Sequence, residues 1–401
     1  MWRSHEARKT AASNVRAPDF PAVGGGAEST APLARRGGSP TPNKHGKCPG
    51  MTQSWTLVTG ANGFLGARLV RRLVEQGKHV KAMVRAGADL SPLKDLPNDR
   101  VRIAVGDCRY QDRVFAALRA CNELYHVAAT YSFNERSAEH ILADSVEGTT
   151  ATLEAARRAG VEKIVFTSSA VTLGSTDRPE IMDETHRPQA GKRPTYIEAK
   201  IRAEEIALER AMRGEPIVVV NPAAVFGPGD NKPTPTGAQV VHYLNTSPSF
   251  KIPIIPGGFG VVDVDDVAAG HIAAMEKGKV GERYILASEN FDTRAFYQLL
   301  ADITGLAEPG GDIAFGQANL MATFEELRSW WAGRDPILSR KALTAYFCEY
   351  RFVSSDKAKR ELGFSPRPAR EALTRACHFF LDGQHVERQA AQRARLELRT
   401  V

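Results

Sequence analysis

The stretch Thr59-Gly60-Ala61-Asn62-Gly63-Phe64-Leu65-Gly66 decides the fold that we expect for this chain. An apolar run at 55–58 precedes it, and an amphipathic run at 67–76 follows it. The pattern predicts a strand that enters a glycine-rich turn, from which a helix begins at once. Because glycine lacks a Cβ, such a turn can approach a ligand closely, and the first N–H groups of the helix can bind a pyrophosphate. The turn therefore predicts a nucleotide cofactor.

The spacing of the three glycines leaves a second interpretation open. Gly60, Gly63 and Gly66 follow the pattern Gly-x-x-Gly-x-x-Gly, whereas the common dinucleotide fingerprint is Gly-x-Gly-x-x-Gly. An ordinary glycine-rich turn between a strand and a helix is the alternative. The place of the turn, at the start of a series of strand and helix patterns, favours the cofactor.

Composition excludes several classes of protein. The net charge of the 401-residue chain is +7, but residues 1–50 hold eight Lys and Arg against three Asp and Glu, so the rest is close to neutral and indicates no nucleic-acid partner. No apolar run approaches the ~18–20 residues that span a bilayer. The five cysteines show no Cys-x-x-Cys pair and the histidines show no metal-ligand spacing, which favours a reducing, cytoplasmic setting without a metal.

The organisation expected from the sequence has four parts. Residues 1–53 form an N-terminal extension for which we expect disorder, because it is rich in Ala, Gly, Pro, Ser and Arg. It is either an Arg-rich targeting segment or, the interpretation we favour, a tail from an upstream start with Met51 as the working initiator. A dinucleotide-binding domain follows at 54–225, a substrate-binding lobe at 226–385, some of whose elements rejoin the first domain, and a charged tail at 386–401.

Alternating strand and helix patterns fill the first domain. Strands are expected at 55–58, 79–84, 101–105, 123–127, 163–166 and 217–220, and helices at 67–76, 110–119, 137–160 and 196–213. This alternation predicts an α/β fold, a doubly wound parallel sheet covered by helices on both faces. Past 225 the chain turns through 227–237, and shorter pieces follow at 264–276, 284–287, 293–304, 320–331 and 370–381. We expect these pieces to form a lobe over the carboxyl ends of the strands.

Three residue types that suit proton transfer lie in the first domain. Tyr196 and Lys200 are four residues apart on an expected helix, so their side chains share one face. A lysine cation beside a phenol favours the phenolate, so we expect the pKa of Tyr196 to be lowered. Thr167 and Ser169, after the fifth strand, offer hydroxyls to a reacting oxygen. The alternative is a chance Tyr-x-x-x-Lys on a helix surface and a serine pair that forms a turn.

These motifs together resemble the extended short-chain dehydrogenase/reductases of the NAD-dependent epimerase/dehydratase family. The likeness rests on the 59–66 turn, Ser169 and Tyr196-x-x-x-Lys200, and covers about residues 54–385. Within that group the chain is most similar to the dihydroflavonol 4-reductase branch and to the bacterial hopanoid-associated sugar epimerases. The segments that carry this finer likeness are 166–174, 232–237, 281–286 and 354–373.

The resemblance implies roles for the catalytic residues. Ser169, which follows Ser168 and precedes Ala170, matches the catalytic serine. Tyr196 matches the general acid/base, and Lys200 matches the residue that holds the nicotinamide ribose and tunes the tyrosine.

The resemblance also implies which residues contact the cofactor. The turn glycines would hold the pyrophosphate, and small residues would let the cofactor pass over the edge of the sheet. The matching positions are Gly60, Gly63, Phe64, Leu65, Gly66, Cys108, Ala128, Ala129, Thr167, Pro222 and Val225. Asp107 would accept a hydrogen bond from the adenine amino group, although it could instead cap the following helix.

The end of the second strand bears on the choice of cofactor. An acidic residue there would bind the ribose 2′-hydroxyl of NAD, but the chain reads Met83-Val84-Arg85. Because the guanidinium of Arg85 can pair with a 2′-phosphate, we expect NADP(H), with NAD(H) as a possibility. The alternative is that Arg85 is only a solvated surface residue.

One position departs from the family pattern. The family usually has asparagine in an Asn-Val-x-Gly-Thr motif, and this chain has Ser145 at the start of the corresponding 145–149 segment. Because serine has fewer hydrogen-bonding atoms and a shorter reach, we expect altered proton exchange behind Lys200.

Three functions remain open from the sequence. The first is a reductase or dehydrogenase that moves hydride between nicotinamide and a carbonyl or alcohol carbon. The second is an epimerase or dehydratase of a nucleotide-linked sugar, and the third is a protein that senses NADP(H) without catalysis. Phe259, Trp330 and Trp331 suggest a bulky, partly apolar small-molecule substrate, although filling the core of the lobe is the favoured interpretation for them. The resemblance also implies a homodimer formed through two long helices.

Overall fold

The computed structural model describes residues 54–129, 138–189, 191, 193–247, 250–331, 340, 343, 349–383, 385–387, 390–392 and 394. All of them belong to one compact unit that extends from Gly50 to Val401. The N-terminal extension, for which disorder was expected, lies outside the described residues, as does most of the charged tail.

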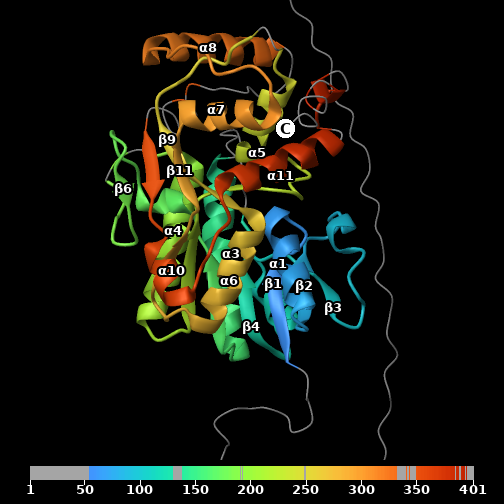
Figure 1. Cartoon of the computed structure of the whole chain (residues 1–401). Coiled ribbons are helices and arrows are strands. Elements are labelled where there is room, and N and C mark those ends of the chain that lie inside the picture. Colours follow the sequence, from blue (N-terminus) through green and yellow to red (C-terminus); the bar gives the residue numbers. More distant parts are fainter. Residues whose placement is uncertain are drawn as a thin grey trace, which may run out of the picture. The chain divides into compact units, whose positions relative to one another are not determined.

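A seven-stranded parallel sheet forms the centre of this unit (Figure 1). Its order is β10-β7-β5-β4-β1-β2-β3. The strands are β1 (Trp55–Thr59), β2 (His79–Val84), β3 (Val101–Val105), β4 (Cys121–His126), β5 (Lys163–Thr167), β7 (Ile217–Pro222) and β10 (Arg283–Leu286). The strand order reverses between β1 and β4, and ligands of doubly wound sheets bind beyond the carboxyl ends of the strands at such a point.

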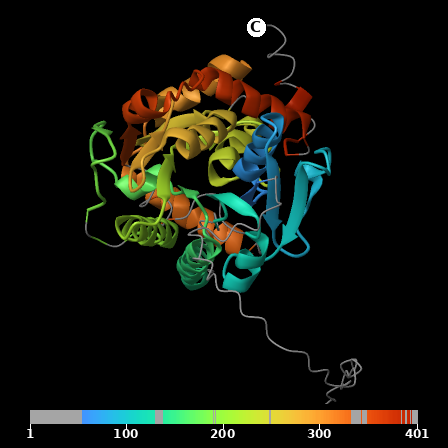
Figure 2. The same cartoon turned by 90° about the horizontal axis from the view of Figure 1, so that it is seen from below.

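Helices cover both faces of this sheet (Figures 1 and 2). On one face α1 (Phe64–Glu75) and α6 (Val264–Lys277) pack against side chains that include Val58 and Val220. On the other face α2 (Gln111–Ala117), α3 (Ala138–Ala159) and α4 (Thr195–Met212) pack against side chains that include Leu57 and Val219. Neighbouring residues of one strand thus enter different cores, which explains the continuous apolar runs in the sequence. The doubly wound α/β class is confirmed.

A second, mixed sheet belongs to a smaller lobe. Its path is β11-β9-β12-β6, with β8 paired to β9. The strands are β6 (Ile181–Met182), β8 (Ala224–Phe226), β9 (Gly258–Asp263), β11 (Glu289–Asp292) and β12 (Tyr350–Val353). The helices of this part of the chain are α5 (Pro235–Asn245), α7 (Thr293–Thr304), α8 (Phe315–Trp331), α10 (Asp356–Leu362) and α11 (Ala369–Asp382). Figure 1 shows α5, α7, α8 and α11 gathered at one end of the main sheet.

Two segments of the second half of the chain take definite places in the structure. The strand expected at 284–287 is β10, an element of 226–385 that joins the first domain: it pairs in parallel with β7 at the edge of the main sheet, where Tyr284 to Leu286 are fully buried. The segment 232–237, expected to be rich in turns, contains the start of α5. Pro235 is the first residue of that helix, and the Thr234 side chain caps it by accepting from the Gly237 N–H at 3.2 Å.

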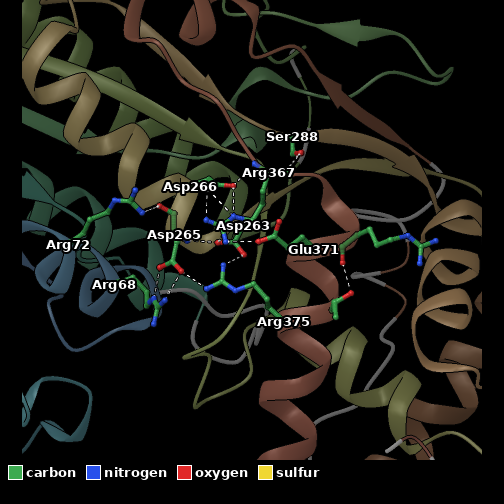
Figure 3. Close-up of polar contacts among 11 residues, drawn as sticks. Arg68, Arg72, Asp263, Asp265, Asp266, Ser288, Arg367, Glu371 and Arg375 are labelled. Atoms are coloured by element: carbon green, nitrogen blue, oxygen red, sulfur yellow. Dashed lines mark hydrogen bonds and ion pairs between the residues drawn. The ribbon is translucent and has the colours of Figure 1, made fainter. Parts of the chain in front are cut away.

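Ion pairs at the start of α6 join three parts of the chain (Figure 3). The guanidinium of Arg68 on α1 donates two hydrogen bonds of 2.6 Å to Asp265. From α11, Arg375 donates to Asp263 at 2.7 Å and to Asp265 at 2.5 Å. A third aspartate of this group, Asp266, accepts from the Arg367 backbone N–H at 2.8 Å and from its guanidinium. We call Asp263, Asp265 and Asp266 the acid cluster; it ties α1 to α11.

We expect the change Arg375→Met to lower the free energy of unfolding by about 1–3 kcal/mol. Asp263 is 0% exposed, and the change removes the cation that lies closest to its carboxylate. Urea denaturation measures the effect. The control is Arg370→Met on the same helix. Arg370 forms an exposed ion pair with Asp302 at 3.5 Å, so its loss should lower the free energy of unfolding by less than about 0.5 kcal/mol. Equal losses from both changes would contradict the prediction.

Candidate active site

A cavity of about 1780 Å³ extends along the carboxyl ends of the main strands and reaches residues of the lobe. Every residue that the sequence predicted for catalysis or cofactor binding lines this one cavity. They are Gly60, Gly63, Phe64, Leu65, Gly66, Arg85, Asp107, Cys108, Ala128, Ala129, Thr167, Ser169, Tyr196, Lys200, Pro222 and Val225. They meet because the carboxyl ends of parallel strands lie at one edge of the sheet.

The glycine turn has space only for glycine at two positions. Gly60 has a φ of +65°, and a Cβ there would lie 2.8 Å from the Cα of Ala128. A Cβ on Gly66 would lie 2.1 Å from the carbonyl oxygen of Gly60. No side chain caps α1 at Gly63, so the first N–H groups of the helix remain available to an anion. This cradle fits the pyrophosphate of a dinucleotide.

Charged side chains surround the end of the cavity near β2. Arg85 is exposed and lines the cavity, and no hydrogen bond or ion pair of its guanidinium occurs within the described residues. Asp107 accepts from the Arg109 backbone N–H at 2.9 Å and from its guanidinium at 2.8 Å. These hydrogen bonds lower the pKa of Asp107. Asp107 does not cap α2, whose N-cap residue is Tyr110.

Burial controls the titration of the predicted acid/base pair. Tyr196 is 8% exposed, and burial raises the pKa of its phenol, while a hydrogen bond with the Ser169 side chain opposes the shift. The lowering that we expected from Lys200 is therefore wrong for this structure. The ammonium of Lys200 donates to the Thr167 carbonyl at 3.3 Å, and burial lowers the pKa of Lys200 to about 8. The hydrogen bond between Ser169 and Tyr196 brings the two residues together in the cavity, and their catalytic roles stay a prediction.

The sequence analysis missed His126, which lines the cavity at the end of β4. The Thr59 hydroxyl accepts from the N–H groups of Val127 and Ala128 at 3.1 Å each, so its own proton points to His126 Nδ1, 2.9 Å away. Burial lowers the pKa of His126 to about 3, and the charge of Lys200 adds to this effect. His126 is therefore a neutral Nε2–H tautomer. A histidine at the end of an apolar central strand was the available signal.

The Thr167 hydroxyl is engaged on the side of the sheet that faces α6. His271 Nδ1 donates to the Val267 carbonyl at 2.8 Å, so its Nε2 accepts from the Thr167 hydroxyl at 2.9 Å. Thr167 lines the cavity, but its hydroxyl proton is donated to His271 and is therefore not available to a substrate. Ser169 is consequently the hydroxyl of this strand end that contacts the phenol.

Ser145 lies on α3 beside the first turns of α4. Its hydroxyl lines the cavity and donates to the Ala199 carbonyl at 3.4 Å, one residue before Lys200. The side chain that replaces the family asparagine therefore reaches the backbone next to Lys200.

Residues 56–287 match the profile of the NAD dependent epimerase/dehydratase family. The chain belongs to this family. It is 36% identical over 339 residues to the "Putative dihydroflavonol 4-reductase" of Synechocystis sp., covering 83% of this chain and 96% of that protein. It is 33% identical to "Sterol demethylase protein B" of Methylococcus capsulatus, covering 81% and 98%. The crystal structure of gox2253 superposes with a TM-score of 0.71 at 35% identity, covering 84% of this chain and all of that one.

Family membership makes the protein an NAD(P)-dependent enzyme of the reductase, epimerase and dehydratase type. The glycine cradle described above is where an epimerase/dehydratase-family fold would hold the dinucleotide. Among the described residues no group of three or more His, Cys, Asp or Glu side chains could hold a metal ion. Within the same residues, none of the helices has the length and apolar character needed to cross a membrane.

The aromatic residues of the lobe divide between cavity and surface. Phe259 lines the cavity and makes an edge contact with Phe296, with ring centroids 5.1 Å apart. Trp331 is 80% exposed, so the expectation that it fills the core of the lobe is wrong. The side chain of Trp330 lies outside the described part of the structure.

Cys108 lines the cavity, and burial raises the pKa of its thiol to about 11, so it stays protonated.

Proposed function

We propose that the protein is an NADP(H)-linked reductase of a carbonyl group in a partly apolar small molecule. When bound, the cofactor supplies the hydride. The substrate oxygen would lie between the Ser169 hydroxyl and the Tyr196 phenol, which contact each other in the cavity. Because burial raises the pKa of Tyr196, the phenol is protonated at neutral pH and can donate its proton as negative charge develops on the oxygen.

Lys200 would support this proton transfer. Its ammonium is fixed by the Thr167 carbonyl, one helical turn from Tyr196. A cation there stabilises the phenolate that remains after the proton has left. The residues that would hold the dinucleotide are those of the glycine turn, together with Asp107, Ala128, Ala129 and the Pro222–Val225 segment.

The observation that carries the choice of NADP(H) is the charge at the end of β2. Arg85 presents a guanidinium to the cavity where an NAD-binding chain would present a carboxylate. Two acidic side chains of the cavity are engaged by other groups: Asp89 accepts from the Ser91 N–H at 2.9 Å, and Asp107 accepts from Arg109. A 2′-phosphate would therefore meet a cation there, and this arrangement favours the phosphorylated cofactor.

The partly apolar substrate is supported by apolar side chains that line the cavity. They are Val171 after β5, and Val241 and Phe259 in the lobe. The names of the two relatives mention a dihydroflavonol and a sterol, both of which are ring systems with large apolar areas.

We expect Arg85→Asp to lower kcat/KM for NADPH by about 10–100-fold, because the ion pair with the 2′-phosphate becomes a repulsion. The same change should raise kcat/KM for NADH, because a carboxylate can accept a hydrogen bond from the ribose 2′-hydroxyl. Initial rates with both cofactors measure the change. The control is Arg178→Asp, an exposed arginine that does not line the cavity. Equal use of both cofactors by the unchanged protein would refute the NADP(H) preference.

A nucleotide-sugar epimerase or dehydratase is the second candidate, because the matched family includes both activities. The same residues would act, with Tyr196 removing a proton from a sugar hydroxyl and later returning it. Stoichiometric loss of the NADPH absorbance with a ketone or aldehyde supports reduction. Turnover of a nucleotide sugar without net loss of cofactor supports epimerisation. Tight NADPH binding with no turnover of any compound supports a sensor.

The homodimer expected from the two long helices also stays a proposal.

A further inference from the structure

Glu204 on α4 forms a buried ion pair behind the active site. It lies one helical turn beyond Lys200, and its side chain is 5% exposed. Arg283 at the start of β10 is 4% exposed and donates from Nη1 to Glu204 Oε1 at 2.9 Å. Arg283 also donates to the carbonyl groups of Glu184 and His186, the latter at 2.8 Å. An ion pair in such surroundings is retained only with its hydrogen bonds satisfied.

The second oxygen of Glu204 has hydrogen-bond partners in the segment after β5 and in strand β7. Oε2 accepts from the Ser168 hydroxyl and lies 2.8 Å from the Thr172 hydroxyl. It also accepts from the Asn221 amide at 2.6 Å. With Arg283, three donors converge on this carboxylate, and the Thr172 hydroxyl, which has one proton, donates either to it or to the Ser169 carbonyl. Burial raises the pKa of Glu204, and the hydrogen bonds from Ser168, Thr172 and Asn221 oppose the rise. An ionised carboxylate accepts all of these hydrogen bonds, whereas a protonated one would have to donate.

The same donors hold the backbone of Ser169. The Ser169 carbonyl lies 2.8 Å from the Thr172 hydroxyl and accepts from the Asn221 amide at 3.2 Å. The Ser169 hydroxyl itself contacts the phenol of Tyr196. The loop is therefore fixed on its buried side by Glu204, while its exposed side presents the serine hydroxyl to the cavity.

We propose that Glu204 is a positioning residue: its ionised carboxylate, neutralised by Arg283, holds the Ser168–Thr172 loop so that the Ser169 hydroxyl meets the Tyr196 phenol. Glu204 does not line the cavity, and it acts through Ser169. The catalytic part of the inference rests on the proposed function, because it takes Ser169 and Tyr196 as the reacting pair.

Glu204 could instead act through Lys200, whose pKa burial lowers and the charge of Glu204 raises. The other groups that face Lys200 include the Thr167 carbonyl from β5, the Tyr196 phenol one helical turn earlier on α4, and His126 from β4, which is neutral. An effect carried by Lys200 would persist when Ser169 is absent, and an effect carried by the loop would not. A double-mutant cycle separates the two routes.

The first experiment compares Glu204→Gln, Ser169→Ala and the double variant in steady-state reduction. We expect Glu204→Gln to lower kcat by about 10–100-fold in the parent chain and by less than about 3-fold in the Ser169→Ala background. The NADPH dissociation constant, measured by fluorescence, should stay within about 3-fold throughout, because the glycine turn is untouched. Additive losses of kcat would overturn the proposal.

A second experiment needs no turnover. Hydrogen–deuterium exchange of the ligand-free chain should be about 10-fold faster at 168–174 in Glu204→Gln, because the Ser168 hydroxyl and the Asn221 amide lose a charged acceptor. The control is Glu154→Gln. Glu154 lies on α3, its carboxylate pairs with Arg210 of α4 at 2.8 Å, and it does not line the cavity. Unchanged exchange at 168–174 in Glu204→Gln would overturn the proposal, whether or not the parent chain is a reductase. Failure of the parent chain to reduce any carbonyl compound would count against the proposed function alone.

Loss of folding has its own control. Glu204→Gln leaves the Arg283 cation buried without its partner, so the pair Glu204→Gln and Arg283→Met removes that charge. In this double variant the thermal midpoint of unfolding should recover toward that of the parent chain. Its kcat should stay low, because the Ser168 and Thr172 hydroxyls still lack the carboxylate. Recovery of both quantities would show a merely structural role and refute the positioning.

Discussion

Replacing Tyr196 by phenylalanine should lower kcat for NADPH-dependent carbonyl reduction by about 10²–10⁴-fold. The change removes the proton donor that contacts Ser169 in the cavity and leaves the ring in place. NADPH should bind as before, because the turn that would hold the pyrophosphate lies at the start of α1. Stopped-time product analysis and a fluorescence titration of NADPH measure the two quantities.

The control for this change is Tyr243→Phe. Tyr243 is also buried, its hydroxyl donates to the Ala307 carbonyl at 3.1 Å, and it does not line the cavity. Its loss should lower stability by about 1 kcal/mol without a change in kcat. If the Tyr196 variant kept the kcat of the parent chain, the phenol would not be the acid.

Replacing Gly66 by alanine should weaken NADPH binding by at least about 100-fold. The new Cβ would lie 2.1 Å from the Gly60 carbonyl oxygen and 2.8 Å from its carbonyl carbon, and both atoms belong to the backbone. The turn can accept the methyl group only by opening, which displaces the N–H groups that would bind the pyrophosphate. Stability should fall as well, by about 1–3 kcal/mol, as expected for an overpacked site.

A second helical glycine provides the comparison. Gly316 lies in α8, and a Cβ there would meet nothing within 4 Å. Gly316→Ala should leave NADPH affinity unchanged and stabilise the helix slightly. Unchanged affinity in the Gly66 variant would mean that the pyrophosphate binds elsewhere.

Much of the first half of the fold could be predicted from the sequence. The strands β2 and β3 have the predicted bounds, because short segments rich in valine and other apolar residues alternate there with helical patterns. The lobe could not be predicted in the same way. Strands β9, β11 and β12 contain glycine or polar residues, and their pairing joins segments far apart in the sequence, as in the match of Tyr350 with Gly258.

The site shows the same division. The glycine turn, Ser169, Tyr196 and Lys200 could be placed together because strand order brings their loops to one edge of the sheet. The pKa of Tyr196 could not be predicted, since it depends on the depth of burial rather than on the spacing to Lys200. Glu204 looked like one acidic residue of a charged helix, although its place four residues after Lys200 put it on the catalytic face.

The cytoplasmic setting stays a prediction.

The position of β10 at the edge of the main sheet has a consequence for engineering. A fragment that stopped after Val225 would lack both the outer partner of β7 and the α6 helix that covers one side of it. This strand, apolar from Ile217 to Val220, would become a bare edge, open to pairing with other chains. The nucleotide half therefore cannot be excised by a single cut, and any chimera that exchanges lobes between relatives must keep Val264 to Leu286 with the host.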